Sequence, residues 1–284
     1  MTDQLSLFEL PPLSKKYTHV FKGLQRPIWT ENKSKMIAIY LRLFVYITKH
    51  GAYIDGFAGP QERDLPEMWT AKLVLESEPK RLGQFFLCEI NRTSWRALEE
   101  LAANHRDRGR KIITYHMDFN DAVHEILGVG DIKETTATFC LLDQRTFECR
   151  WSTVQALAKA KTGMKIEQFY FVPTGWLQRS LSALQNHEIA REWWGRDDWA
   201  KLKDLPGQSC ANLFCERFQQ ELGYRYAHAW PIYERKEGRK IMYYMVHATD
   251  HEEAPKLMAR AYRGATGQIL EHQLLLNLPP PNES

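Results

Sequence analysis

Five short apolar segments alternate with segments of helical periodicity along the first 173 residues of the chain. The apolar segments cover residues 52–59, 83–90, 111–118, 136–143 and 165–173. They are nearly continuous in apolar character, which is typical of parallel strands buried on both faces. Parallel strands need crossover connections, and helices usually supply them. The pattern therefore predicts an α/β fold, with a mostly parallel sheet covered by helices on both faces.

The first helical segment precedes all the strands and has one apolar face. Its apolar residues recur at spacings of three and four positions, at Met36, Ile39, Tyr40, Leu43, Phe44 and Ile47. This spacing predicts an amphipathic helix packed on the sheet. We expect Thr30 to be its N-cap and Gly51 to end it.

The last third of the chain has a different pattern. Residues 224–235 and 240–250 are strand-like and are joined by a short Lys-Glu-Gly-Arg link, which predicts an antiparallel hairpin at the end of the sheet. The resulting domain would span residues 17–264, with a helical insertion at about 174–222. Residues 1–16 and 265–284 are expected to be tails.

Composition excludes several classes of protein. The 284 residues are 44% hydrophobic and 26% charged, and no apolar run approaches the roughly 18 residues that cross a bilayer. We therefore expect a cytoplasmic protein without membrane contact. The five cysteines are an odd number and two lie in apolar strand-like segments, so we expect buried free thiols. They show no CxxC or Cys/His spacing, so we expect no metal site. The net charge of +3 permits contact with a polyanion without requiring it.

Acidic residues end the first four apolar segments, and ligands of open parallel sheets bind beyond the carboxyl ends of the strands. The first segment ends in the turn Asp55-Gly56-Phe57-Ala58-Gly59, and the next three end in Glu89, Asp118 and Asp143. Glu89 could accept hydrogen bonds from a ribose diol, and Asp118 from an adenine amino group. Because the turn lacks the G-x-G-x-x-G pattern of dinucleotide sites, it favours S-adenosylmethionine over a nicotinamide cofactor. Taken singly, each acid would more often be a solvated residue of a strand-end turn, and only together do they favour a nucleotide-type ligand.

The stretches WTENKSKMIAIYL, YIDGFAGP and IMYYMVHATDHEEAPKLM, with the strands ending in Glu89 and Asp143, together resemble the three-Cys-motif partner protein family over roughly residues 28–262. The resemblance implies a Rossmann-like, S-adenosylmethionine-dependent methyltransferase fold. It also implies a partner protein that carries a three-cysteine motif like that of radical S-adenosylmethionine enzymes.

The resemblance further implies a catalytic loop after the fourth strand. The family has Asp-Pro-aromatic-Gly there, similar to the Asp-Pro-Pro-Tyr loop of amino methyltransferases, whereas this chain has Asp143-Gln144-Arg145-Thr146-Phe147. By that similarity Asp143 would hold an exocyclic amine and Phe147 would stack on a flipped base. A second departure is Gln61, which stands where the family has glycine.

Two stretches could contact nucleic acid. Lys33 and Lys35 are expected on the polar face of the first helix, where they would be solvated or would contact phosphate. The stretch REWWGRDDW interleaves Arg191 and Arg196 with tryptophans, which suits binding to single strands. The alternative is a helical cap packed by its tryptophans.

The amino-terminal tip contains Gln4-Leu5-Ser6-Leu7-Phe8, followed by Pro11 and Pro12. This stretch resembles the peptide with which bacterial DNA polymerases and repair proteins bind the replicative sliding clamp. Leu7 and Phe8 would enter an apolar pocket of the clamp, unless they cover a patch of the protein's own fold.

These features lead to two main hypotheses of function. The first is an S-adenosylmethionine-dependent methyltransferase that acts on DNA or another nucleic acid in bacterial genome maintenance and is recruited by the sliding clamp. The second is a non-catalytic DNA-repair adaptor that keeps the fold and recruits the three-Cys-motif partner. A nicotinamide-dependent oxidoreductase is a third, weaker alternative because no phosphate-binding loop is evident.

Overall fold

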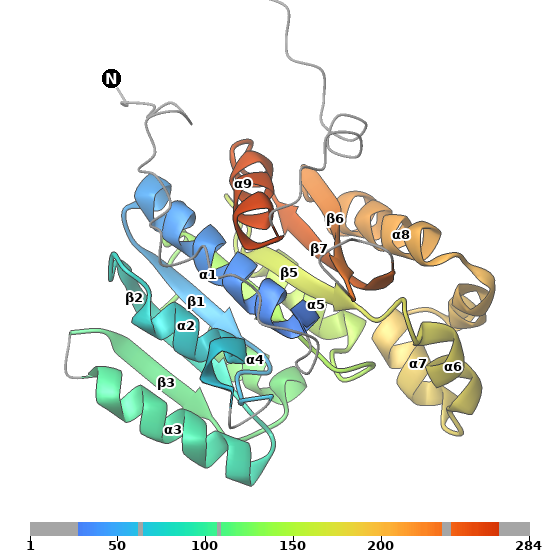
Figure 1. The fold of residues 1–284 in the computed structure, drawn as a ribbon, viewed down its shortest axis with the longest axis horizontal. Coiled ribbons are helices and arrows are strands. Elements are labelled where there is room, and N and C mark those ends of the chain that lie inside the picture. The colour runs from blue at the N-terminus through green and yellow to red at the C-terminus, as the bar shows by residue number, and fades with distance from the viewer. Residues whose placement is uncertain (1–27, 62–64, 107–108, 235–239, 267–284) are drawn as a thin grey trace, which may run out of the picture.

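The computed structural model describes residues 28–61, 65–106, 109–234 and 240–266. Within these ranges seven strands form a single sheet in the order β3-β2-β1-β4-β5-β7-β6 (Figure 1). The strands are β1 (Gly51–Asp55), β2 (Leu82–Cys88), β3 (Lys111–Tyr115), β4 (Thr138–Leu142), β5 (Glu167–Val172), β6 (Tyr226–Tyr233) and β7 (Ile241–Thr249).

The first five strands are parallel, and β7 pairs antiparallel with both β5 and β6. The predicted α/β fold is confirmed: the sheet is Rossmann-like and mostly parallel, and it ends in an antiparallel hairpin. The hairpin enters the sheet through its second strand, so that β6 forms the outer edge.

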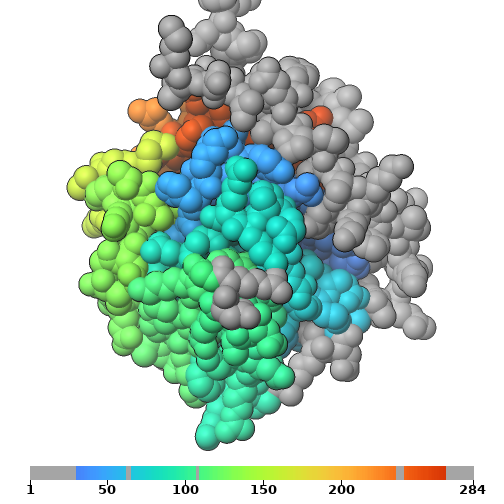
Figure 2. Space-filling view, turned by 90° about the vertical axis from the view of Figure 1, so that its left-hand side faces the viewer, coloured from blue at the N-terminus to red at the C-terminus, as the bar shows by residue number. Residues whose placement is uncertain are grey.

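Helices cover both faces of the sheet. One face carries α1 (Ile28–Thr48), α2 (Thr70–Glu76), α3 (Arg92–Arg106) and α9 (Ala254–Thr266), which lie in front of the sheet in Figure 1. The other face carries α4 (Phe119–Gly128), α5 (Trp151–Lys159) and α8 (Gly207–Gln220). The 3₁₀ helix η2 (Pro66–Met68) precedes α2. At the β3 edge, α3 and its neighbours form the green lower part of the surface in Figure 2.

Neighbouring residues of the central strands alternate between the two cores. Tyr53 of β1 and Phe139 of β4 pack beneath α1, whereas Ile54 and Cys140, the next residue of each strand, pack on the opposite face. Since both faces are buried, both sets of positions must be apolar. This arrangement explains the continuous apolar segments of the sequence.

Two predicted boundaries of the first helix are wrong. Thr30 lies inside α1, and Gly51 is the first residue of β1. The helix ends at Thr48, and Lys49 has a positive φ of 66°. Gly51 is required for space instead, because a Cβ there would lie 2.9 Å from the carbonyl oxygen of Ala137 and 2.9 Å from the Phe44 ring.

The segment predicted as a helical insertion contains α6 (Leu177–Ala183), α7 (His187–Trp194), the 3₁₀ helix η3 (Asp197–Asp204) and α8. Of these, α8 packs against β6 and β7 and belongs to the helical layer of the sheet. At the carboxyl end, α9 continues to Thr266, and both Ala265 and Thr266 are buried. The predicted domain and tail boundaries themselves stay predictions.

All five cysteines are free and buried. In the part of the chain that the structure describes, no helix has the length and apolar character needed to cross a membrane.

Candidate functional site

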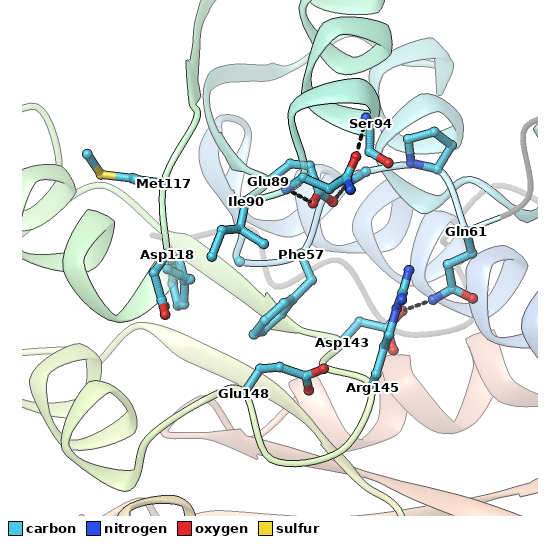
Figure 3. A pocket seen from close by; sticks show the side chains of 15 residues that line it. Phe57, Gln61, Glu89, Ile90, Ser94, Met117, Asp118, Asp143, Arg145 and Glu148 are labelled. Atoms are coloured by element: carbon cyan, nitrogen blue, oxygen red, sulfur yellow. Dashed lines mark hydrogen bonds between the residues drawn. The ribbon is translucent and has the colours of Figure 1, made fainter. Parts of the chain in front are cut away.

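A cleft of about 350 Å³ lies beyond the carboxyl ends of the parallel strands (Figure 3). Its volume falls within the range of roughly 300–1,000 Å³ typical of small-molecule sites. The structure brings six of the predicted site residues together in its wall: Gly56, Phe57, Gly59, Glu89, Asp118 and Asp143.

The turn after β1 forms the floor of the cleft, and its glycines are there because side chains would not fit. A Cβ on Gly56 would lie 2.8 Å from the Phe119 ring, and one on Gly59 would overlap the Glu89 carboxylate. Between them, Ala58 is buried and its N–H donates to the carbonyl oxygen of Cys88 at 2.8 Å. The turn is therefore tied to β2, and its glycines leave the floor open to a ligand.

Asp55 lies beneath the cleft instead of lining it. Its carboxylate accepts hydrogen bonds from the Tyr53 hydroxyl at 2.8 Å and from the Phe57 N–H at 3.1 Å. Burial raises the pKa of Asp55 to about 7; the nearby Asp143 carboxylate also raises it, whereas Lys33 and the two hydrogen bonds lower it. Asp55 thus shapes the turn from below.

Glu89 connects the β1 turn to the start of α3. One carboxylate oxygen accepts from the Gly59 N–H at 3.1 Å and the other from the Asn91 N–H at 2.7 Å. A carboxylate has about four acceptor sites, so two remain for a ligand. Glu89 can therefore still accept hydrogen bonds from a diol.

Asp118 occupies the opposite side of the cleft as the N-cap of α4. Its side chain accepts from the Asn120 N–H at 2.8 Å and from the Asn120 amide at 2.8 Å. The Asn120 amide also donates to the carbonyl oxygen of Glu148 at 2.7 Å. The loops after β3 and β4 are thereby joined around the cleft.

Asp143 is 7% exposed and is held from two sides. Its Oδ2 atom forms an ion pair with Lys33 and accepts a hydrogen bond from the Gln61 amide at 3.2 Å. The next residue, Gln144, fixes the loop by donating to the carbonyl oxygen of Phe171 at 3.2 Å and accepting from the Cys149 N–H at 2.9 Å. Gln144 therefore anchors this loop through its side chain.

Phe147 does not line the cleft. Its ring packs edge-on against Trp193, with the ring centroids 4.9 Å apart. The ring is partly buried in the core beneath α7. The loop after β4 therefore brings Asp143 to the cleft, whereas the Phe147 ring, predicted to stack on a base, packs away from it.

The expectation that Lys33 and Lys35 are solvated is wrong. Lys33 is 3% exposed and Lys35 is 7% exposed. Lys33 pairs with Asp143, and Lys35 pairs with Glu31 one turn earlier on α1. Neither ammonium group lies at the surface, where it could contact phosphate, because α1 is covered by α2 and α9.

The stretch at 191–199 is a helical cap packed by its tryptophans. Trp193 and Trp194 are fully buried and Trp199 is 8% exposed, so their rings cannot stack on bases without disrupting the fold. Arg191 and Arg196 are exposed but form ion pairs, Arg191 with Glu188 and Asp197, and Arg196 with Glu221. Their contact with nucleic acid stays a prediction.

The residues of the predicted clamp-binding tip, Gln4, Leu5, Ser6, Leu7 and Phe8, lie outside the described residues. Among those that are described, no group of histidine, cysteine, aspartate and glutamate side chains could hold a metal ion.

Several residues of the cleft were not predicted. They lie one to a few positions from the strand-end acids and comprise Pro60, Ile90, Asn91, Ser94, Met117, Phe119, Arg145 and Glu148, together with Gln61, which had been noted only as a departure. Their closeness in sequence to the strand-end acids could have predicted that they line the cleft. The contact of Lys33 with Asp143 had no such signal, because the two residues are 110 positions apart.

No protein-family model matches the chain, and no curated protein matches it significantly. Solved structures resemble it distantly. The protein LPL1258 of Legionella pneumophila is 9% identical, with a TM-score of 0.46, over 85% of this chain and 94% of that one. TYW2 of M. jannaschii, solved with AdoMet, is 10% identical, with a TM-score of 0.42, over 80% of this chain and 77% of that one. Spermidine synthase of Thermotoga maritima is 10% identical, with a TM-score of 0.43, over 90% of this chain and 72% of that one.

Proposed function

We propose that this chain binds S-adenosylmethionine in the cleft and is a methyltransferase. One observation carries the proposal: the half-buried Glu89 carboxylate lies beside the glycine turn of β1 and keeps acceptor capacity after binding two backbone N–H groups. This combination suits a ribose diol. Asp118, on the opposite wall, suits an adenine amino group.

The remaining part of the cleft would hold the methyl group. Bound S-adenosylmethionine supplies an electrophilic methyl group on a sulfonium. With the nucleoside between Glu89 and Asp118, the sulfonium would point toward Asp143, which lines the same cleft. Asp143 would then orient the group that accepts the methyl by accepting a hydrogen bond from it.

Two Gly→Ala variants test this site, one inside the cleft and one outside it as a control. In Gly59→Ala the new Cβ would displace the Glu89 carboxylate, whereas in Gly83→Ala, on β2, it would meet no atom within 4 Å. We expect Gly59→Ala to weaken S-adenosylmethionine binding on the order of 30-fold and Gly83→Ala to leave it unchanged, as measured by calorimetry. Absence of binding to the unmodified protein at millimolar ligand would disprove the proposed function.

A non-catalytic adaptor is the second candidate, and the loop after β4 favours it. Phe147 packs against Trp193 and the family's proline is replaced by Gln144, whose side chain anchors the loop. Transfer of a tritiated methyl group to DNA separates the two candidates. Binding without transfer to DNA, RNA or protein would favour the adaptor.

The wider role that we propose is in bacterial genome maintenance. Support comes from the clamp-like tip at residues 4–8, and the net charge of +3 permits contact with nucleic acid. Nucleic acid would be the substrate, the sliding clamp would recruit the protein, and a three-Cys-motif protein would be its partner. The partner rests on the sequence resemblance alone.

A further inference from the structure

Lys33, from α1, contacts Asp143 at the proposed methyl end of the cleft. Lys33 lies behind Asp143 and does not itself line the cleft. It is 3% exposed, and its ammonium contacts Oδ2 of Asp143. The ring of Tyr243, from β7, lies on its other side, with the ammonium 5.9 Å from the ring centroid. A lysine buried to this extent is retained in its charged form only with a partner, and Asp143 is that partner.

Besides Arg145 and Glu148, which also line the cleft, its charged groups differ between the two ends. Glu89 and Asp118 place two carboxylates around the proposed nucleoside end. At the other end, Lys33 offsets the charge of Asp143, and Gln61 adds a neutral hydrogen bond to the same oxygen. Figure 3 shows Asp143, Gln61 and Arg145 together on one side of the cleft and Asp118 on the other.

We infer that Lys33 is a positioning residue of this site: it cancels the charge of Asp143 and occupies Oδ2, so that Asp143 serves the site as a neutralised hydrogen-bond acceptor and not as a counter-ion for the sulfonium. The inference rests on the proposed function. An unpaired carboxylate beside the methyl group would attract the cationic donor more than its neutral product. With Lys33 in place, Asp143 does not favour the cationic donor over the neutral product.

The charge of the ligand provides the test. S-adenosylmethionine carries a sulfonium, whereas S-adenosylhomocysteine has a neutral sulfur and is otherwise nearly the same molecule. Calorimetry at pH 6, where Asp55 is mostly protonated, gives the ratio of the two affinities for each variant. Loss of fold stability alone would weaken both ligands alike and leave the ratio unchanged.

Two single variants should shift the affinity ratio in opposite directions, and the double variant should restore it. Asp143→Asn leaves the Lys33 ammonium uncompensated and should shift the ratio on the order of tenfold toward S-adenosylhomocysteine. Lys33→Met leaves the carboxylate uncompensated and should shift it a similar amount toward S-adenosylmethionine. The double variant Lys33→Met/Asp143→Asn removes both charges and should restore the ratio of the unmodified protein.

Lys161→Met is the matched control. Lys161 is also a buried lysine, 6% exposed, but it contacts Thr138 at the opposite end of β4. Its removal should leave the ratio unchanged. If Lys33→Met does not fold, the inference is tested by comparing Asp143→Asn with the double variant. The affinity ratio should be shifted in the first and restored in the second.

The possible results separate the two proposals. If both single variants still bind the ligands and their affinity ratios stay within twofold of that of the unmodified protein, the inference about Lys33 is overturned. The proposed function would stand. Failure of both ligands to bind the unmodified protein would overturn the proposed function and this inference with it.

Discussion

At the scale of single residues, the site depends on polar groups that the fold removes from water. Asp55 is 1% exposed, and its carboxylate is hydrogen-bonded to Tyr53 and Phe57. Burial disfavours the charged form, which raises the pKa of Asp55 to about 7. The turn that bears the proposed ligand is thus built over a carboxyl group that is partly protonated near neutral pH.

This pKa predicts how stability depends on pH. The folded protein holds a proton on Asp55 between about pH 4 and pH 7, where the unfolded chain has lost it, so stability falls as the pH rises through this window. The change amounts to on the order of 4 kcal/mol. In Asp55→Asn the amide oxygen can accept from the Phe57 N–H and the amide nitrogen can donate to the Tyr53 hydroxyl oxygen. Because the amide does not titrate, this fall should disappear.

Urea unfolding of both proteins from pH 4 to pH 8 measures the effect. His228 acts in the opposite direction, since burial lowers its pKa to about 4 and its contribution is lost as the pH falls from about 6.5. The difference between variant and parent at each pH removes that contribution. A difference that does not change with pH would contradict the assignment.

At the scale of elements, cation and aromatic groups bind the helical segment after β5 to the sheet. The Arg217 guanidinium of α8 lies between two rings, 3.9 Å from the centroid of Trp151 in α5 and 4.0 Å from that of Trp194 in α7. It also donates to both carboxylate oxygens of Glu221, at 2.5 and 2.8 Å. One side chain thus connects three helices.

Arg217→Lys should therefore be costly. Lysine keeps the charge but cannot stack on two rings or donate to two oxygens in the same geometry. We expect the free energy of unfolding to fall by about 2–4 kcal/mol. Arg191→Lys, at an exposed ion pair of α7, should cost about 1 kcal/mol or less in the same urea titration. If the two variants lose similar amounts of unfolding free energy, the stacking of Arg217 between two rings does not stabilise the protein more than an exposed ion pair does.

At the scale of the whole molecule, the cleft and the clamp-like tip are separate parts of the chain. Leu7→Ala/Phe8→Ala in the full chain should abolish binding to the host's sliding clamp, which we expect to be about micromolar in the unmodified protein. Leu10→Ala/Leu13→Ala, in the same stretch but outside the motif, should bind as before. Fluorescence anisotropy measures both.

The affinity for S-adenosylmethionine should be the same in all these tip variants, since none of the described residues that line the cleft is changed. If the Leu7→Ala/Phe8→Ala variant instead binds the clamp normally, the tip has another role. The argument for a DNA substrate would then lose its main support.

The sequence alone predicted the elements and the location of the cleft. Strands buried on both faces must be apolar throughout, so the five parallel strands were visible as continuous segments. Because all parallel strands of such a sheet point the same way, the acids at the strand ends were expected to lie at one edge. These acids are Asp55, Glu89, Asp118 and Asp143, and the last three line the cleft. These are consequences of local periodicity and strand direction.

Only the tertiary structure determined what each polar group contacts. Lys33 and Lys35 have the spacing of a polar helix face, yet both are buried because α2 and α9 pack over α1. Trp193 and Trp194 resemble a surface for base stacking, yet they fill a core. A side chain's partner depends on residues brought together from distant parts of the chain, and local sequence carries no signal for such contacts. For that reason the sequence revealed the acid Asp143, and only the fold revealed the lysine that neutralises it.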